Sequence, residues 1–460
     1  MSAPNKKMIA KEAATTIVRK LREEGHQAYF VGGCVRDLLL GREPADFDIA
    51  TSATPEQVMK IFPRTYAVGA QFGVVLVPAS DLAPVTSQEQ ASDRREEIIE
   101  VATFRSDGDY LDGRRPRQVS YTTSAEEDVQ RRDFTINGLL FDPEKDEVLD
   151  FVGGRFDLNA GILRTIGDPR LRFTEDKLRM IRAIRFAARL DYQVELETML
   201  AIREYAASIG DVSKERIREE LLKMLTEGKA DAAFAMLDAS SLLAQILPEV
   251  AAMKGVQQPP QYHPEGDVWV HTLMMLGMLP AGTSPALAMG VLLHDVGKPP
   301  TFRVAPDRIR FDGHVGVGVK MAEAICKRLR FSNEDTAQIL ALVANHMRFA
   351  DVKKMKESTF KRFLRLPRFE EHLELHRIDC MSSHGKLEFY DFVKERRAAL
   401  PPETIHPRPL LSGNDLMAAG YPAGPRFKEI LAALEDAQLE GRINSRSDAL
   451  VYLATEFPKP

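Results

Sequence analysis

Cysteine is scarce in this chain, and no apolar run is long. The cysteines Cys34, Cys326 and Cys380 are the only three in 460 residues; they exclude a disulfide scaffold and have no zinc-type spacing. The longest near-continuous apolar stretch, Ala286–Leu293, is far too short to span a bilayer. The N-terminus has no apolar signal core and predicts an amphipathic helix from about Met8 to Glu24. We therefore expect a cytoplasmic protein with no membrane partner.

Neither sign of charge dominates the composition. The chain has 62 Lys and Arg against 67 Asp and Glu, a net charge of −5, which does not favour nucleic-acid binding by bulk charge but does not exclude a local basic patch. A chain of 460 residues is long enough for about three domains. Eight of the ten histidines fall between His263 and His384, which indicates a second chemistry in the C-terminal half.

The hydrophobic patterns predict an α+β fold. Strand candidates between residue 26 and about 155 are HQAYFVGG, Asp46–Ala50, Gly73–Val77, Glu97–Phe104 and Val148–Val152. The polar, turn-rich segment Pro78–Glu96 is expected to be a mobile loop. From Thr174 onward the patterns are helical, and EDKLRMIRAIRFAARL predicts one long helix with Thr174 as its N-cap. The expected domains are 1–155, 156–255, 256–405 and 406–460.

Two short motifs near the N-terminus are typical of a metal and nucleotide site. In FVGGCVRDLLLG a strand ends in Gly32 and Gly33 and a helix begins, so that backbone N–H groups and Arg36 can face an anion. Asp46 and Asp48 are two apart and share one face of a strand. Such a pair repels itself unless a hard cation such as Mg²⁺ lies between the oxygens. A tight turn and an exposed pair of aspartates are the alternative interpretations.

Two further charged motifs follow. Ser124-x-x-Glu127 predicts a helix start that leads into RRDFTIN, where arginines and an asparagine can hold phosphates and ribose hydroxyls. In EDKLR, Asp176 and Arg179 are three apart on the predicted helix. A carboxylate and a guanidinium can together accept the amino-plus-acceptor edge that cytosine and adenine share, and reject uracil and guanine. A surface ion pair is the simpler alternative.

These motifs occur in an order that resembles a known family. GGCVRDLLLGREPADFDIATSATPEQV, VGAQFGVVLV, EVATFR, RRDFTINGLLFD, DFVGGRFDLNAGILRTIG and TEDKLRMIRAIRFAARL look like the motifs of class II CCA-adding enzymes and bacterial poly(A) polymerases. That family belongs to the DNA polymerase β-like nucleotidyltransferases. The resemblance covers about residues 26–250, and it implies a polymerase β-like head followed by an all-α neck.

The resemblance implies a role for each motif residue. Asp46 and Asp48, with Glu100 as a third acidic residue, would carry the catalytic Mg²⁺. The triphosphate and ribose would be held by Gly32, Gly33, Arg36, Arg132, Asp133 and Asn137. Asp176 and Arg179 would select CTP and then ATP, with Glu175 orienting the arginine. The partners would be tRNA, CTP and ATP, with no protein partner required, and Pro78–Glu96 would help the switch from C to A.

The histidine-rich segment has a pattern of its own, H…HD…H…H…D. The candidate metal ligands on successive predicted helices are His271, His294, Asp295, His314, His346 and Asp379. The pattern resembles the HD phosphohydrolase superfamily over residues 263–385, which implies a divalent transition metal such as Mn, Ni or Fe and hydrolysis of phosphoesters at RNA ends. Lys298 would contact phosphate. A relic domain with a structural metal is the competing interpretation.

One basic cluster contradicts the acidic average. The segment DVKKMKESTFKRFLRLPRF predicts RNA phosphate contacts by Lys353, Lys354, Lys361, Arg362 and Arg365, with a solvated helix face as the alternative. PLLSGNDLMAAGYPAGPRFKEILAALEDAQLEG resembles the C-terminal tail of bacterial CCA-adding enzymes, which holds tRNA in that family. The favoured function is CCA addition to tRNA 3′ ends. A poly(A) polymerase, an enzyme that adds only CC or A, and an HD phosphohydrolase with an RNA-binding N-terminal half remain alternatives.

Overall fold

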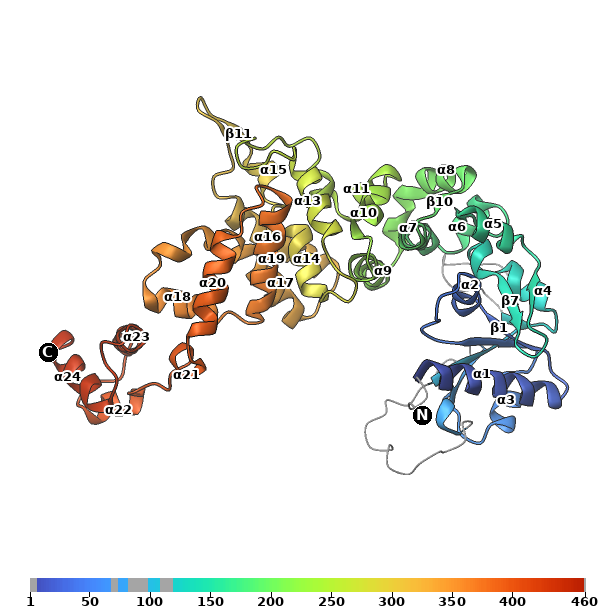
Figure 1. Cartoon of the computed structure of the whole chain (residues 1–460), viewed down its shortest axis with the longest axis horizontal. Helices are drawn as coiled ribbons and strands as arrows, with labels where there is room; N and C mark the ends of the chain where they lie inside the picture. The colour runs from blue at the N-terminus through green and yellow to red at the C-terminus, as the bar shows by residue number, and fades with distance from the viewer. Residues whose placement is uncertain (1–5, 68–72, 82–97, 108–118, 459–460) are drawn as a thin grey trace. The chain divides into compact units, whose positions relative to one another are not determined.

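A computed structural model describes residues 6–67, 73–81, 98–107 and 119–458 (Figure 1). Its contacts divide the chain into two compact units. The first comprises Met1–Met224 and Ala232–Ile246, and the second comprises Leu225–Asp231 and Leu247–Pro460. Within the described ranges no helix combines the length and apolarity that crossing a membrane requires. Most of the loop predicted at Pro78–Glu96 lies outside the described residues.

The first unit is built on a six-stranded mixed sheet with the order β3-β4-β2-β1-β7-β8. Only the β2–β4 pair is parallel; the other neighbours are antiparallel. The strands are β1 (Ala28–Val31), β2 (Asp48–Thr51), β3 (Val74–Pro78), β4 (Ile98–Thr103), β7 (Leu139–Asp142) and β8 (Glu147–Asp150). The sequence predicted five of them to within two residues and missed β7. The α+β class of the head is confirmed.

Helices pack against this sheet and fix its edges. α1 (Lys6–Glu23), close to the predicted helix, packs on β1 and β2 through buried residues such as Ile17 and Leu21. α2 (Gly33–Leu39) packs on β1 and β7. The other elements beside the sheet are α3 (Pro55–Ile61), the hairpin β5 (Arg105–Asp107) and β6 (Val119–Tyr121), α4 (Ala125–Gln130) and the 3₁₀ turn η4 (Thr135–Asn137). The Ser124 hydroxyl caps α4, as predicted.

The predicted long helix after Thr174 is two helices, so that prediction was wrong. α6 (Pro169–Glu175) ends at Asp176, whose backbone is extended, and α7 (Leu178–Leu190) begins two residues later. The Asp176 carboxylate accepts the Leu178 backbone N–H at 3.1 Å, a local bond that competes with helix continuation. The actual N-cap of α6 is Asp168, directly before a proline. Thr174 lies in the last turn of α6.

Helices and two short strands complete the first unit. They are α5 (Gly154–Ala160), the parallel pair β9 (Ile162–Leu163) and β10 (Gln193–Val194), α8 (Leu196–Tyr205), η5 (Ala206–Asp211), α9 (Lys214–Thr226), α10 (Ala230–Ala239) and α11 (Leu242–Ile246). The division between the units crosses α9 and α10. The predicted boundary at residue 155 falls inside α5, and the one at 255 follows α12 (Pro248–Ala251).

The second unit is mostly helical. α14 (Pro285–Leu293) is buried from Ala286 to Leu293 and packs against α13 (Val268–Gly277), α17 (Asn333–Asn345) and α19 (Phe369–Ser382), while α16 (His314–Arg328) packs on α17. This burial explains why the longest apolar run in the sequence is a core helix. A short turn, α15 (Lys298–Thr301), and a hairpin of β11 (Arg303–Val304) and β12 (Ile309–Arg310) connect α14 to α16.

The second unit also contains two separate apolar clusters. One joins η6 (His346–Lys354), α18 (Glu357–Leu364), α20 (Glu388–Ala399) and α21 (Pro402–Ile405) around Phe349 and Phe363. The other joins α22 (Gly413–Ala418), α23 (Arg426–Leu439) and α24 (Arg446–Glu456) around Leu416 and Ile430. The predicted boundary near residue 405 falls between the two clusters.

Candidate functional site

Three carboxylates meet at the end of β2 and β4. Asp48 is the first residue of β2 and lies directly opposite Glu100 of the parallel strand β4. Asp46, which is exposed, comes two residues before Asp48. Burial, and then the charges of Asp46 and Glu100, raise the pKa of Asp48 to about 7. This donor set fits a hard divalent cation, whose charge would offset that repulsion.

The predicted glycine turn brings arginines to the same edge of the sheet. Gly32 has a φ of 77°, a conformation that favours glycine, and it begins α2. A Cβ atom on Gly32 would lie 3.9 Å from Nη1 of Arg132, and one on Gly33 would lie 3.6 Å from Nη2 of Arg36. The charge of Arg132 also lowers the pKa of Asp48. The glycine turn, Arg132 and the carboxylates therefore form one site.

Asp128, which sequence reasoning missed, holds the paired arginines. Its Oδ2 accepts from Nη2 of Arg132 at 2.8 Å, and its Oδ1 accepts from Nη2 of Arg131 at 2.5 Å. Burial raises the pKa of Asp128, but the two arginines outweigh that effect and hold it below its usual value. The spacing of three and four residues from Asp128 to the arginines was the available signal.

A chain of polar contacts connects the remaining RRDFTIN residues to the glycine turn. Nη1 of Arg36 donates to Oδ1 of Asn137 at 2.8 Å, and Nδ2 of Asn137 donates to Oδ1 of Asp133 at 3.2 Å. Oδ2 of Asp133 accepts from Nη2 of Arg182 at 2.6 Å, a contact that the sequence did not predict. Arg36 and Arg182 also lie over the ring of Phe186, 5.6 and 5.4 Å from its centroid. Helix α7 is thereby fastened to this motif.

Asp176 and Arg179 lie at the junction of α6 and α7, and each has its own partner. Oε2 of Glu175 accepts from Nη1 of Arg179 at 2.5 Å, the orienting contact that the resemblance implied. The same oxygen accepts from Nη1 of Arg172 at 2.6 Å. Oδ2 of Asp176 accepts from Nη2 of Arg216 on α9 at 2.7 Å. Both arginines were missed: Arg172 pairs with Glu175 three residues later within α6, a spacing that the sequence offered, whereas the contact of Arg216 crosses from α9.

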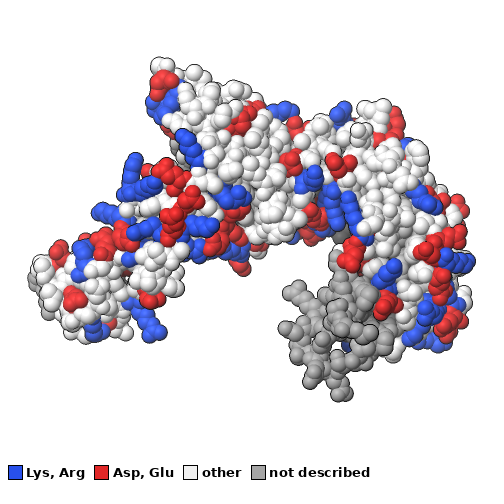
Figure 2. All heavy atoms as spheres, viewed as in Figure 1, with Lys and Arg blue, Asp and Glu red and all other residues white. Residues whose placement is uncertain are grey.

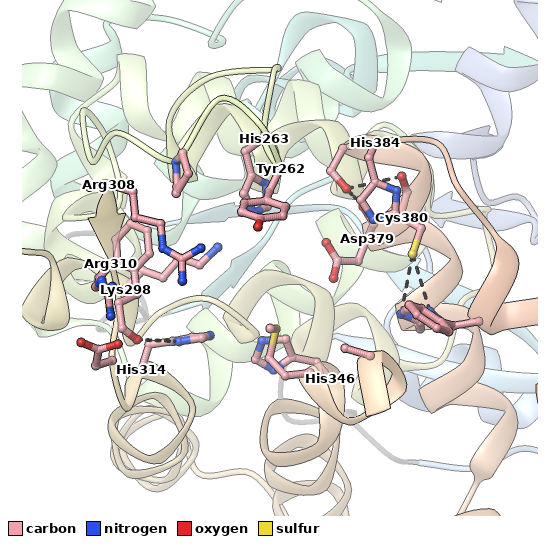
Figure 3. A pocket seen from close by; sticks show the side chains of 18 residues that line it. Tyr262, His263, Lys298, Arg308, Arg310, His314, His346, Asp379, Cys380 and His384 are labelled. Atoms are coloured by element: carbon pink, nitrogen blue, oxygen red, sulfur yellow. Dashed lines mark hydrogen bonds between the residues drawn. The ribbon is translucent and has the colours of Figure 1, made fainter. Parts of the chain in front are cut away.

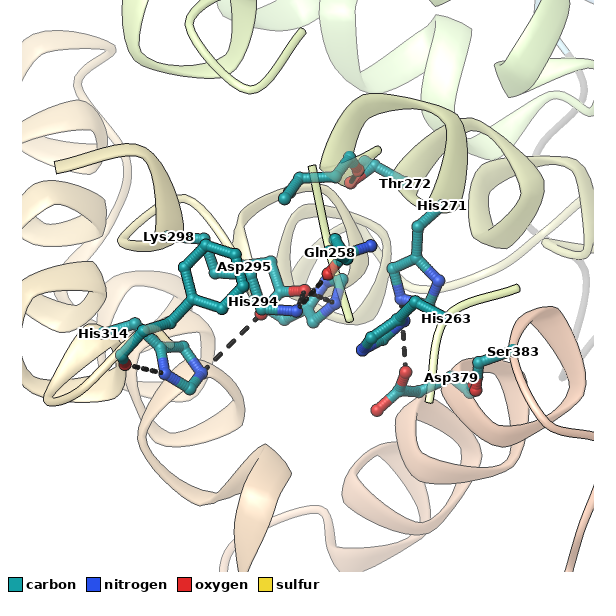
Figure 4. Close-up of polar contacts among 12 residues, drawn as sticks. Gln258, His263, His271, Thr272, His294, Asp295, Lys298, His314, Asp379 and Ser383 are labelled. Atoms are coloured by element: carbon teal, nitrogen blue, oxygen red, sulfur yellow. Dashed lines mark hydrogen bonds and ion pairs between the residues drawn. The ribbon is translucent and has the colours of Figure 1, made fainter. Parts of the chain in front are cut away.

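All six predicted metal ligands of the C-terminal half come together in the second unit. Figure 4 labels five of them, and Figure 3 labels the sixth, His346. They form two groups of three whose ligand atoms lie within 4.8 Å of one another: His271 with His294 and Asp379, and Asp295 with His314 and His346. A third such group, unpredicted, joins His263 and Glu265 to His271. Burial disfavours charge on His271, but Asp379 and Glu265 outweigh it and raise the pKa to about 9. Burial lowers the pKa of His346 to about 4.

The hydrogen bonding of the histidine nitrogens indicates whether a metal ion fits this site. The Nε2 atoms of His271, His294, His314 and His346 are buried and make no hydrogen bond. A buried imidazole nitrogen without a partner is unfavourable unless something else binds it. Imidazole and carboxylate donors together suit borderline divalent metals. The donor set therefore fits two such ions.

A cavity of about 570 Å³ opens beside these ligands. His314, His346 and Asp379 line it, and so do the basic residues Lys298, Arg308 and Arg310 (Figure 3). Figure 3 shows Arg308 and Asp379 reaching the cavity from opposite sides. Nζ of Lys298 donates to Oδ2 of Asp295 at 2.6 Å, so this lysine neutralises part of the cluster's charge. The cavity can accept an anionic group next to the predicted metal ligands.

Models of known protein families match three parts of the chain. Residues 28–164 match the poly A polymerase head domain, and residues 191–254 match the model described as "Probable RNA and SrmB- binding site of polymerase A". Residues 314–454 match tRNA nucleotidyltransferase domain 2. All three models describe parts of poly(A) polymerases or tRNA nucleotidyltransferases. The match to the poly A polymerase head domain implies a divalent metal ion at the head.

Curated relatives and solved structures agree with these matches. The CCA-adding enzyme of Geobacillus thermodenitrificans is 42% identical over 240 residues, which are 52% of this chain and 55% of that enzyme. That of Enterococcus faecalis is 44% identical over 215 residues, 47% of this chain and 49% of the relative. The matches thus span about half the length of these curated relatives.

The structural similarity extends further along the chain. The crystal structure of Bacillus stearothermophilus CCA-adding enzyme in complex with CTP has a TM-score of 0.73 and 27% identity over 97% of each chain. The Thermotoga maritima CCA-adding enzyme complexed with tRNA_CCA, at 18% identity and a TM-score of 0.55, covers 96% of this chain and 94% of its own and shares the fold. The domain 2 model covers His314, His346 and Asp379 but begins after His271 and His294.

The basic cluster predicted in the second unit is largely engaged within the chain. Arg362 pairs with Glu435 and Asp436 of α23, and Arg365 pairs with Glu435. Lys361 is buried and donates to the Leu439 carbonyl at 2.7 Å. Figure 2 shows Lys and Arg side chains interspersed with Asp and Glu over this region. The contacts favour a structural role for these three residues.

Lys353 and Lys354 are exposed, and their predicted RNA contacts stay a prediction. Lys353 forms an ion pair with Glu388 and lies over the rings of Phe389 and Phe392. An ion pair this exposed is weak and can exchange its carboxylate for a phosphate.

Proposed function

We propose that the chain adds CCA to the 3′ end of tRNA in the cytoplasm, using CTP and then ATP and no protein partner. The observation that carries the proposal is the pairing of Asp48 with Glu100 across β2 and β4, with Asp46 two residues away. These carboxylates would hold Mg²⁺, which when bound supplies charge stabilisation to the reacting phosphate. The similarity to CCA-adding enzymes supports the reaction.

The other residues of the head and α7 position the substrates. The terminal ribose hydroxyl of the RNA attacks the α-phosphorus of the nucleotide, and the bond to pyrophosphate breaks. Arg132 and Arg36, beside the glycine turn, bind the triphosphate. Asp176 accepts the exocyclic amino group of the base, and Arg179 donates to its ring acceptor. Glu175 holds the Arg179 guanidinium in place. Such positioning supplies most of the catalysis that a nucleotidyl transfer needs.

The purified chain can be tested with a tRNA transcript that lacks its 3′ CCA, in the presence of Mg²⁺ and CTP, ATP or both. We expect two additions with CTP and a third only when ATP is also present. Asp46→Ala and Asp48→Ala should abolish addition, whereas Glu456→Ala, an exposed residue of α24, should leave it unchanged. A long ladder with ATP alone would instead identify a poly(A) polymerase, and a stop after CC or a single A would identify a partial enzyme.

A second function is favoured by the histidine cluster: we propose that it hydrolyses phosphoesters at RNA ends. The supporting observation is that four buried Nε2 atoms make no hydrogen bond and lie 3.1–3.8 Å from carboxylate oxygens of Asp295 or Asp379. These residues would hold two divalent transition metal ions such as Mn, Ni or Fe, which when bound supply an activated water. Arg308 and Arg310 of the cavity would bind the phosphate.

Hydrolysis can be measured on a 2′,3′-cyclic nucleotide and on RNA that ends in a cyclic phosphate, with each metal added alone. His294→Ala should lose metal-dependent hydrolysis while its CCA addition persists. The matched control is His406→Ala, an exposed histidine outside the cluster, which should behave as the parent. Equal hydrolysis by the parent and His294→Ala would contradict this second function.

A further inference from the structure

Three of the four histidines with unpartnered Nε2 atoms share one local geometry. Nδ1 of His294, His314 and His346 lies 2.8, 2.9 and 2.7 Å from the backbone carbonyl oxygen three residues earlier. A carbonyl oxygen only accepts, so Nδ1 carries the proton in each ring. Nε2 is then left with the lone pair that a metal requires. In these three residues the backbone alone selects the ligand atom.

His271 is the exception. The carbonyl three residues before it, that of Val268, accepts the Thr272 hydroxyl at 2.8 Å. Nδ1 of His271 lies instead 2.7 Å from Oε1 of Glu265. Its Nε2 lies 3.2 Å from Oδ1 of Asp379 without forming a hydrogen bond, which is the arrangement expected of two atoms that bind the same metal ion. The Glu265 carboxylate therefore accepts from Nδ1 of His271, as backbone carbonyl groups do for the other three histidines.

Glu265 serves a second histidine through the same oxygen. Oε1 of Glu265 lies 2.8 Å from Nδ1 of His263, and the rings of His263 and His271 meet edge to face with centroids 5.0 Å apart. The Glu265 side chain is only 5% exposed, and its Oε2 is buried with no hydrogen bond. His263 lines the cavity together with Asp379 and Lys298. One buried carboxylate thus contacts both rings: that of His271, a predicted metal ligand, and that of His263, which lines the cavity. Figure 4 labels the two histidines.

We propose that Glu265 is the positioning residue of the histidine site, holding His271 as a metal ligand and His263 as a contact to the bound phosphoester. The inference rests on the proposed hydrolytic function. A carboxylate that accepts from the outer nitrogen of a ligating histidine fixes the ring and makes it a better donor, and removing such a partner lowers metal affinity about 10–100-fold. His263 contributes no ligand in this scheme.

The test uses the full chain with Asp46→Ala and Asp48→Ala, so that metal binding at the head is removed from the measurement. Titration with Mn²⁺ and, separately, Ni²⁺ gives the affinity of the histidine site. Glu265→Ala should weaken binding about 10–100-fold, and Glu265→Gln, which retains an acceptor oxygen without the charge, should weaken it less. The matched control is Glu249→Ala, which breaks an ion pair with Arg328 outside the cavity and should bind as the parent.

The outcomes separate the inference from the function beneath it. A parent chain that binds neither metal overturns both. A parent that binds, with Glu265→Ala and Glu265→Gln binding equally well, overturns only the role of Glu265. His263→Ala should bind Mn²⁺ as the parent does but hydrolyse more slowly at any substrate concentration below saturation. A loss of metal affinity in His263→Ala as large as in Glu265→Ala would make His263 a ligand and overturn its assignment.

Discussion

Asp176 is held by Arg216, a residue 40 positions further along the chain, and not by Arg179. Its other oxygen accepts the Leu178 backbone N–H, so both carboxylate oxygens have a fixed direction. Arg179 is held independently by Glu175. The two side chains proposed to recognise the base therefore do not neutralise each other, and each keeps hydrogen-bonding capacity for a nucleotide.

Arg216→Ala should impair nucleotide selection. Without the charge-assisted bond, worth roughly 1.5–3 kcal/mol, the Asp176 carboxylate can rotate away from the base. We expect kcat/KM for CTP and for ATP to fall by about tenfold and misincorporation of UTP to rise. Single-nucleotide addition kinetics measure both. Arg203→Ala, which removes an exposed arginine that donates to the Ala239 carbonyl, serves as the control. Parent-like selectivity in Arg216→Ala would sink the proposal.

Asp48 should make the first unit less stable as the pH rises. The unfolded-state pKa of an aspartate is about 3.9, and in the folded chain burial, Asp46 and Glu100 raise that of Asp48 to about 7. The folded state binds the extra proton, so this group destabilises the fold progressively from about pH 4 to pH 7. In EDTA, Asp48→Asn should therefore raise the melting temperature more at pH 8 than at pH 5.

Calorimetry of the full chain measures this effect. The single tryptophan, Trp269, is buried in the second unit, so its fluorescence identifies which transition belongs to that unit. Adding Mg²⁺ at pH 8 should stabilise the parent and not Asp48→Asn. A parent and variant whose melting temperatures differ equally at the two pH values would show that the pKa of Asp48 is not raised in the folded chain.

The sequence predicted what lies within short motifs and missed what crosses between them. Asp48 and the glycine turn could be placed because alternation and turn chemistry act over a few residues. The break at Asp176 was missed because an apolar helical pattern runs through it. Only the hydrogen bond from the Leu178 backbone N–H to the Asp176 side chain shows that one helix ends there and another begins. The residues that hold the predicted ones in place, such as Arg216 and Glu265, make contacts that no local pattern encodes.

The basic cluster illustrates the same limit. Seven positive charges in DVKKMKESTFKRFLRLPRF indicated an RNA surface, since only two acidic residues lie nearby in sequence. Three of those charges find their partners on α23, and Glu435 lies 70 residues from Arg365. A charge run can be interpreted only when its distant neighbours are known.

Glu435→Lys should weaken the packing of the C-terminal cluster of α22, α23 and α24 against α18. Glu435 accepts from both Arg362 and Arg365, and each pair is partly exposed, so each contributes at most about 1 kcal/mol. Reversing the charge removes both pairs and adds repulsion. We expect faster proteolytic cleavage between residues 406 and 412 in limited digestion, and a smaller difference at high salt. Glu456→Lys, a charge reversal on exposed α24, should digest as the parent, and equal digestion of the two variants would count against this docking.

Gly297→Ala should separate His294 and Asp295 from His314, the predicted metal ligand at the start of α16. A Cβ atom on Gly297 would lie 2.1 Å from the His314 carbonyl oxygen and 2.5 Å from the Gly318 nitrogen, so backbone must move to admit it. Asp295, 3.8 Å from Nε2 of His314, would move with it. We expect the free energy of unfolding to fall by about 1–3 kcal/mol or more and Mn²⁺ to bind more weakly. Urea unfolding monitored by Trp269 fluorescence measures the first effect.

Gly316→Ala is the matched control, because its Cβ would meet no atom within 4 Å and it lies in helix α16. Alanine there should stabilise the helix by up to about 1 kcal/mol and leave Mn²⁺ binding unchanged. The two substitutions add the same methyl group but should have different effects. Gly297→Ala is expected to force the predicted metal ligands apart, whereas Gly316→Ala only favours the helix. If Gly297→Ala unfolded at the same urea concentration as the parent, the close packing of this loop on α16 would not determine how the histidine site is assembled.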